Sequence, residues 1–218
     1  MKKISFISII IIISVGFFYF DELIGSYPIK NIKYKGTFLR SNEHIIKNQL
    51  KKYIDNDLLK INIRNIREEI ESNSWIKSVL VSRDFPDTLV IDFLEYEPLF
   101  FWNAKYVIGI NGEVFQINNT KRLKLPIVTT DINITNTIYT LYVTLTDELD
   151  KLGLTITSVS IKSDILYIHT NKHLIITRYS SYKPKLNDLI DVYEEMITKY
   201  NRKISTIDLR YSTGFAVK

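Results

Sequence analysis

One uninterrupted apolar stretch near the N-terminus constrains this chain more than any other feature. Residues 4–20 form a run of 17 residues without a charged side chain. As a helix rising about 1.5 Å per residue, the run would reach roughly 25 Å, close to the thickness of a bilayer's hydrocarbon core. Lys2 and Lys3 precede it and Asp21 follows it, which by the positive-inside rule puts the rest of the chain outside the cytoplasm. The sequence therefore predicts one membrane anchor and an exported body.

A cleaved signal peptide is the alternative for this stretch. The apolar part of a signal peptide is usually shorter and ends near small residues that a peptidase recognises. Here the run ends in the aromatic residues 17–20, which suit the interface belt of a retained helix. We therefore expect residues 1–3 to be a cytoplasmic stub and residues 4–24 to be a transmembrane helix.

The composition excludes several kinds of site. The chain contains no Cys, so it can form neither a disulfide nor a thiolate metal site. Its formal charge is +5, and its lysines and acids are intermixed along the chain, which argues against a nucleic-acid binding surface. The chain beyond the apolar stretch is long enough for one large or two small domains, and we expect two.

Residues 27–97 show the pattern of a small domain with the order strand, helix, helix, strand, strand. Residues 27–34 alternate as a half-buried strand, and Ser41 is expected to cap a helix with Ile45 on its buried face. The second helix carries a stripe of three isoleucines: Ile63, Ile66 and Ile70. Two β-rich runs around a Pro-Asp turn then predict a hairpin, so that a three-stranded sheet is backed by two helices.

The hairpin contains a series of residues that fits a known family. These residues are Trp75, Arg83, Phe85, Pro86, Asp87, Leu89, Glu95, Pro98 and Trp102. In this order they resemble the POTRA (polypeptide-transport-associated) domain of the FtsQ/DivIB family of bacterial cell-division proteins. Within the series, we expect the POTRA turn residues Arg83, Phe85, Pro86 and Asp87 to shape the turn rather than bind a partner.

Residues 98–218 predict a second, mixed domain with a mostly antiparallel sheet and flanking helices. Pro98 marks the boundary, and an Asn-Gly pair at 111–112 joins two short strands. Leucines at helical spacing predict a helix that ends at Gly153. Three strand runs, an amphipathic helix and two terminal strand segments, 206–211 and 215–217, complete the domain. The predicted fold class is α+β throughout the exported part.

The last segments resemble the closing motif of the FtsQ-type β-domain, so the resemblance covers anchor, POTRA domain and β-domain. It implies a non-catalytic, bitopic scaffold of the divisome that helps to control septum assembly. It also implies a single-pass type II protein of the cell inner membrane at the division septum, with its bulk in the periplasm. The implied partners are the extracytoplasmic segments of FtsB and FtsL and other divisome membrane proteins. The chain stops at Lys218, where longer members continue, so contacts of that tail would be missing.

A terminal strand at a sheet edge offers backbone groups that another chain can complete by adding a strand. By the resemblance, the partner-binding residues are Arg210, Tyr211, Thr213, Gly214, Phe215 and Lys185. Arg210 would pair with an acidic residue of the partner, and Tyr211 would be the aromatic anchor. The residues alone leave open that Tyr211 and Phe215 are only core and rim residues of a C-terminal strand.

The sequence offers no constellation for chemistry. His169 and His173 are expected to be surface side chains near a turn, and neither they nor His44 have further metal ligands at suitable spacing. No nucleophile triad or phosphate loop can be assembled, so we expect no enzyme activity, no cofactor and no small-molecule substrate. The alternatives are a POTRA-containing envelope chaperone or protein-translocation component and, more remotely, an anchored cell-wall hydrolase.

Overall fold

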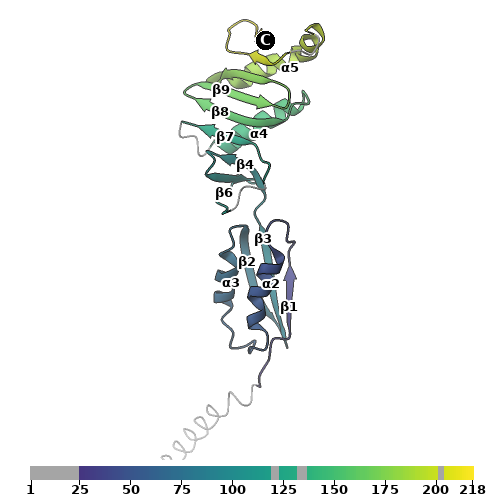
Figure 1. Cartoon of the computed structure of the whole chain (residues 1–218), viewed down its shortest axis with the longest axis vertical. Helices are drawn as coiled ribbons and strands as arrows, with labels where there is room; N and C mark the ends of the chain where they lie inside the picture. The colour runs from purple at the N-terminus through teal and green to yellow at the C-terminus, as the bar shows by residue number, and fades with distance from the viewer. Residues whose placement is uncertain (1–24, 119–122, 132–136, 201–203) are drawn as a thin grey trace, which may run out of the picture. The chain divides into compact units, whose positions relative to one another are not determined.

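The computed structural model describes residues 25–118, 123–131, 137–200 and 204–218 (Figure 1). The predicted transmembrane helix, residues 4–24, lies outside these ranges. In the described part of the chain, no helix combines the length and the apolar character needed to cross a bilayer. The chain divides into two compact units, Met1–Tyr96 and Glu97–Lys218.

The first unit is a three-stranded sheet with two helices (Figure 1). Along the chain it contains β1 (Asn31–Lys35), α2 (Glu43–Leu50), a 3-10 turn (Lys51–Tyr53), α3 (Ile63–Glu71), β2 (Ile76–Asp84) and β3 (Thr88–Glu95). In space the strands lie in the order β1-β3-β2, with β1 parallel and β2 antiparallel to the central β3. The predicted β-α-α-β-β order is therefore confirmed.

Asparagine side chains start both helices of this unit. The Oδ1 atom of Asn42 accepts from the N–H of Ile45 at 3.3 Å, and Asn62 does the same for the first turn of α3. The prediction that Ser41 is the cap is wrong, because Ser41 is buried and its N–H and hydroxyl donate to Glu95 instead. Ile45 is also 52% exposed, which contradicts its predicted place on the buried face.

Alternating side chains bring one face of the sheet against the helices. Leu89, Ile91 and Phe93 point from β3 into the same cluster as the helical isoleucines Ile66 and Ile70. Burying each such side chain stabilises the fold by about 1.5–3 kcal/mol. The hairpin between β2 and β3 is thus held by its inner face, and its outer edge along β2 lies at the end of the sheet.

The second unit is a nine-stranded mixed sheet with two helices. Its elements are β4 (Pro98–Trp102), β5 (Tyr106–Gly109), β6 (Val114–Phe115), β7 (Ile127–Thr130), α4 (Ile138–Asp150), β8 (Ile156–Lys162), β9 (Ile165–Thr170), β10 (Leu174–Arg178), a 3-10 turn (Tyr179–Ser181), α5 (Tyr182–Lys199), β11 (Thr206–Asp208) and β12 (Ala216–Val217). In space the order is β12-β11-β10-β9-β8-β7-β4-β5-β6. Three pairings are parallel and five are antiparallel, which agrees with the predicted mostly antiparallel sheet.

Two strands of this sheet, β4 and β7, were not predicted. Pro98 pointed to a boundary, but it is the first residue of β4, a position where proline breaks no ladder inside the strand. β7 has four residues and pairs in parallel with β4 and β8, which are far from it in sequence. A parallel neighbour leaves no hairpin signal in the local sequence.

Both helices contribute to one core with the inner face of the sheet. Leu145 and Leu149 from α4 and Leu189 from α5 are fully buried with Ile168 and Ile175 from β9 and β10. α4 ends as predicted: Gly153 has a φ of +64°, and the N–H of Leu154 donates to the carbonyl of Leu149 at 3.1 Å. α5 then carries the chain across to β11, which lies parallel to β10.

Candidate partner-binding edge

β12 is the last strand at one end of the nine-stranded sheet, among the strands that the structure describes. Its backbone pairs with β11 around Lys218, whose N–H and carbonyl both bond to Thr206 at 3.0 Å. In an antiparallel ladder, every second residue pair exchanges backbone hydrogen bonds. The N–H and carbonyl of Ala216, two residues before Lys218, therefore also face β11. The N–H and carbonyl of Val217, which lies between them, point away from β11. We call this outward side of residues 215–218 the β12 edge.

The side chains of β12 show which of its residues belong to the domain itself. Phe215 and Val217 are partly buried against the core of the unit, and Leu209, just after β11, is completely buried. Phe215, predicted as a partner-binding residue, therefore packs on this chain's own core. Ala216 is exposed on the opposite face of the strand.

Arg210 lies just beyond β11 and bonds to Asp208 two residues before it. Its Nε donates to Oδ1 at 2.9 Å, and its Nη2 donates to Oδ2 at 2.6 Å, which makes a bidentate pair. The Arg210 backbone N–H also donates to Oδ1 at 3.1 Å. The side chain of Arg210 is still 40% exposed, so its remaining N–H groups can reach a second acceptor.

The pair shifts the titration of both groups. Hydrogen bonds from the Arg210 side chain, opposed by partial burial, lower the pKa of the Asp208 carboxyl below its ordinary value of 3.8. The same bonds raise the pKa of the Arg210 guanidinium. Arg210 was predicted to pair with an acidic residue of a partner, and the structure shows that it already holds one within this chain.

Residues 211–214 form an exposed loop between β11 and β12. Tyr211 is 54% exposed, so most of its ring is available for contact. Thr213 is exposed, and Gly214 has a φ of +78°, a conformation that L side chains rarely adopt. A Cβ at Gly214 would meet no atom within 4 Å, so the backbone conformation, rather than crowding, selects glycine here.

Lys185 on α5 reaches this loop from another element. Its Nζ donates to the carbonyl of Ser212 at 3.2 Å and lies 3.6 Å from the carboxylate of Asp188. Its side chain is only 18% exposed. The structure therefore brings Lys185 beside the predicted loop residues, with a role in holding the loop.

The POTRA turn residues, in contrast, make most of their contacts with other residues of their own unit. Arg83 donates from Nε to the carbonyl of Leu58 at 2.6 Å and from Nη2 to the carbonyl of Ile61 at 2.8 Å. The backbone carbonyl of Asp87 accepts from Lys30. Pro86 is exposed and follows a cis peptide bond, and the ring of Phe85 packs edge-on against Tyr27 with centroids 5.6 Å apart.

The three histidines are not gathered at this edge. His44 and His169 are exposed, but the prediction of a surface position for His173 is wrong, since it is 6% exposed. Its Nδ1 lies 2.7 Å from the carbonyl of Ile204 and its Nε2 lies 2.8 Å from the hydroxyl of Tyr193. With both ring nitrogens engaged, His173 ties α5 to the start of β11 rather than offering a metal ligand.

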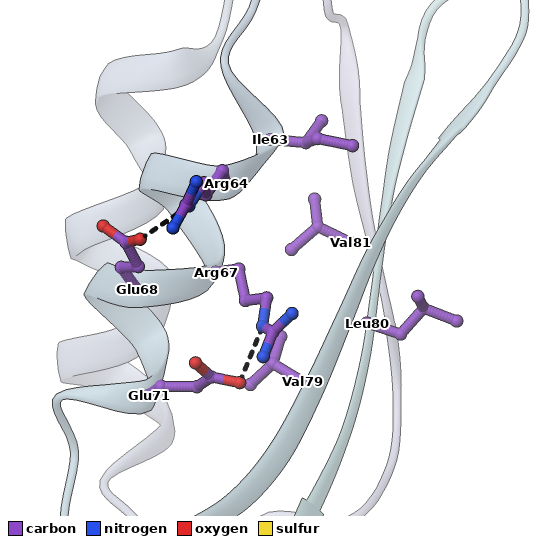
Figure 2. Close-up of a pocket in the computed structure, with 8 residues that line it drawn as sticks. All are labelled: Ile63, Arg64, Arg67, Glu68, Glu71, Val79, Leu80 and Val81. Carbon is purple, nitrogen blue, oxygen red and sulfur yellow. Dashed lines mark hydrogen bonds and ion pairs between the residues drawn. The ribbon is translucent and has the colours of Figure 1, made fainter.

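A second open strand lies in the first unit, where β2 runs beside α3. The groove between them has a volume of about 460 Å³. Figure 2 shows ion-paired side chains of α3 on one side and apolar side chains of β2 on the other. Leu80 of β2 is 65% exposed. This groove was not predicted, because a helix and a strand that pack together carry no shared local pattern.

Fold and edge together define a class: a protein with a POTRA-like first unit and a second unit in which β12 lies at one end of the sheet, among the strands that the structure describes. Residues 27–96 match the family described as POTRA domain, FtsQ-type. The chain is 24% identical to the cell division protein FtsQ of Neisseria meningitidis serogroup B, over 88% of this chain and 82% of that protein. It is 22% identical to FtsQ of Alcanivorax borkumensis over 91% of this chain and 79% of that protein. It is 27% identical to FtsQ of Escherichia coli K12 over 70% of this chain and 58% of that protein.

Residues 27–96 are thus an FtsQ-type POTRA domain, and the chain is similar to FtsQ cell division proteins over most of its length. The family resemblance that the sequence indicated is therefore confirmed. Asp208 is the functional candidate that sequence reasoning missed. In an extended chain, residues two positions apart point to the same side, so the spacing of Asp208 and Arg210 could have predicted that their side chains pair.

Proposed function

We propose that this protein is a non-catalytic, bitopic membrane scaffold of the bacterial divisome. In this proposal the β12 edge receives an extracytoplasmic segment of FtsB, in complex with FtsL, and thereby helps to control septum assembly. The observation that carries it is the outward-pointing backbone of Val217, on the strand that follows the segment with the exposed Arg210 and Tyr211. An added strand would complete the ladder, while the two side chains would select the partner.

The charges at this edge favour a partner with an acidic residue near the strand that adds. Asp208 occupies one side of the Arg210 fork, and a second carboxylate would share the exposed remainder. Tyr211 supplies a large ring with only two side-chain torsions, which lowers the entropy lost on binding. Lys185 acts through the loop, because its contact with Ser212 limits where Tyr211 can lie.

Pull-down of FtsB and FtsL segments by the full chain in detergent tests the side-chain part of this proposal. Tyr211→Ala should weaken capture by about 30-fold, since truncating a central aromatic anchor costs about 2 kcal/mol or more. Arg210→Glu should abolish capture, because it places like charges together. Tyr200→Ala is the matched control, since Tyr200 is 48% exposed but lies at the end of α5. Normal capture by both Tyr211→Ala and Arg210→Glu, with cooperative melting, would refute the assignment.

A proline pair tests the backbone part. Val217→Pro removes an N–H that points to the partner and leaves the bonds to β11 in place, so the domain should lose only some packing of the Val217 side chain, still melt cooperatively, and lose capture. Ala216→Pro removes an N–H that faces β11, so it should destabilise the strand itself. Undiminished capture by Val217→Pro would show that no strand adds at this edge.

We also propose that residues 1–3 remain in the cytoplasm, residues 4–24 cross the inner membrane once, and the POTRA domain (27–97) and β-domain (98–218) lie in the periplasm at the septum. Support comes from the apolar run, its flanking charges and the FtsQ relatives. Because the chain has no Cys, single cysteines can be introduced without background. A cysteine in the β-domain should react with an impermeant maleimide added to intact spheroplasts, whereas labelling only after lysis would reverse the orientation.

A second function, a POTRA-containing envelope chaperone or translocation component, draws support from the groove beside β2. An extended exported chain could add to that strand while its side chains meet the ion pairs of α3. Depletion of the protein separates the two functions. Long undivided filaments support the divisome role, whereas loss of outer-membrane proteins with normal septation supports the second.

A further inference from the structure

The end of the POTRA domain where the described chain begins is built from three segments: residues 27–30, 55–61 and 84–87. We call it the entry tip. Backbone hydrogen bonds join the segments: Leu58 N–H to Tyr27 carbonyl at 2.7 Å, Asp55 N–H to Ile29 carbonyl at 2.9 Å, and Lys30 N–H to Asp87 carbonyl at 2.9 Å. The side chain of Arg83 holds the segment 55–61 in place by donating to the carbonyls of Leu58 and Ile61. The tip is therefore a rigid surface.

Two large apolar side chains project from this surface. Phe85 is 52% exposed and Leu59 is 41% exposed. Neither belongs to the described core of the first unit. The ring of Phe85 packs against the ring of Tyr27, and the backbone of Leu59 is held by its N–H bond to the Asp57 carboxylate at 2.9 Å. Large apolar side chains that are grouped on one surface and left open to solvent indicate a contact surface.

The short length of chain between the apolar stretch and the entry tip indicates which surface the tip would face. The apolar stretch ends at Phe20, and residues 21–26 connect it to Tyr27. Six residues extend at most about 3.5 Å each, so the tip stays within roughly 20 Å of the end of that stretch. If the stretch spans a bilayer, this short connection keeps Phe85 close to the lipid surface, so that contact between them needs no further association step.

The chemistry of the tip suits a lipid surface of low charge. Phe, Tyr and Leu side chains partition into the headgroup region, and aromatic rings are enriched there. The three segments carry two lysines and four aspartates, so the tip has no excess of positive charge that would attract anionic lipid. Apolar burial, rather than attraction to anionic lipid, would drive the contact.

We propose that Phe85, Leu59 and Tyr27 dock the POTRA domain on the outer surface of the membrane that anchors the chain. The inference rests on the proposed function in one respect, the anchor. The docked tip fixes the orientation of the POTRA domain on the bilayer, so that β1 and β3 stand away from the membrane with their far ends outward. A tether alone would leave that orientation undetermined.

Spin labels on the full chain in phosphatidylcholine vesicles test the proposal, since the chain has no cysteine of its own. A nitroxide at Leu59→Cys should collide several-fold more with lipid-soluble oxygen than with an aqueous nickel complex. Leu39→Cys is the control: Leu39 is 68% exposed, and its N–H bonds to Glu95 at the far end of β3. Its label should prefer the aqueous complex. In the double variant Phe85→Asp, Leu59→Cys, the label at residue 59 should collide more with the aqueous nickel complex than with oxygen.

The outcomes separate the inference from the anchor on which it rests. If alkaline carbonate leaves the chain in the vesicles but both labels are aqueous, the docking is refuted and the anchor stands. If carbonate releases the chain, the anchor is refuted and the docking falls with it. Should Phe85→Asp fail to melt cooperatively, the contrast between Leu59→Cys and Leu39→Cys still decides the question.

Discussion

Arg83 and Arg210 both lie close to a strand end, one in each unit, yet their surroundings give them different roles. Arg83 donates to two backbone carbonyls that are 25 and 22 residues away in sequence. Arg210 donates to a carboxylate only two residues away and leaves part of its fork exposed. Arginine that satisfies distant backbone groups holds a fold together, whereas arginine held by a neighbouring carboxylate keeps part of its guanidinium open to solvent, as the proposed partner contact requires.

The largest effect should come from Arg83. Arg83→Ala leaves the carbonyls of Leu58 and Ile61 without their charged donor, so we expect the POTRA domain to lose about 2–4 kcal/mol in free energy of unfolding. Urea denaturation measures the change. Arg67→Ala is the matched control, because the Arg67 side chain is 57% exposed and pairs with Glu71 one turn away, and such solvent-exposed pairs contribute little. Equal effects of the two substitutions would break the comparison.

Arg210→Ala should show the reverse profile. The midpoint of urea denaturation should fall only slightly, because the lost ion pair is partly open to solvent at Arg210, which is 40% exposed. Capture of the FtsB and FtsL segments should fall. A large loss of stability would mean that Arg210, like Arg83, is an architectural residue.

The pH dependence of stability sharpens the comparison further. Because Arg210 lowers the pKa of Asp208 in the folded chain, the pair stabilises the fold above the ordinary pKa of 3.8, and this contribution is lost as pH falls through the lowered value. The difference in stability between the unmodified protein and Arg210→Ala should therefore be present above about pH 5 and vanish at lower pH.

Carbon-13 NMR titration of the carboxyl groups supplies a direct check of that pH effect. Arg210→Ala should raise the pKa of Asp208 toward its ordinary value. The pKa of Asp164 is lowered chiefly by the backbone N–H of Ser180, so it should not respond. An unchanged Asp208 would show that Arg210 is not the cause of its lowered pKa.

The smallest effect should come from Lys185. Lys185→Ala removes one hydrogen bond to the Ser212 carbonyl, which we expect to change the free energy of unfolding by under about 1 kcal/mol. The loop at Tyr211 should become more mobile, and amide hydrogen exchange at residues 211–214 would report it. Unchanged exchange there would limit Lys185 to its pairing with Asp188.

The POTRA domain could be predicted because its signals are local. The isoleucine stripe of α3 and the alternation in β2 and β3 each identify an element within its own residues. Ile45 failed because isoleucine is abundant in this chain, so an isoleucine at helical spacing also occurs on exposed faces. Ser41 failed because the acceptor of its donors, Glu95, is 54 residues away in sequence.

The candidate edge was only partly predictable, for a related reason. The sequence placed a strand over residues 206–211, but β11 ends at Asp208 because Arg210 turns back onto that carboxylate. Which strand lies at the end of the sheet depends on parallel pairing across α5, and spacing alone contains no such information. The exposure of Tyr211 and the partial burial of Phe215 both follow from that topology. The family resemblance therefore indicated both residues as partner-binding but could not tell that Phe215 packs on the core of this chain.

The pairing of β1 with β3 has a mechanical consequence. The chain enters the POTRA domain at β1 and leaves it after β3, and these two strands lie parallel over five paired residues. A pull on the two ends would therefore draw the strands past each other and load all of these contacts at once, instead of peeling them apart in turn. Single-molecule stretching between residues 27 and 96 should therefore show a high rupture force.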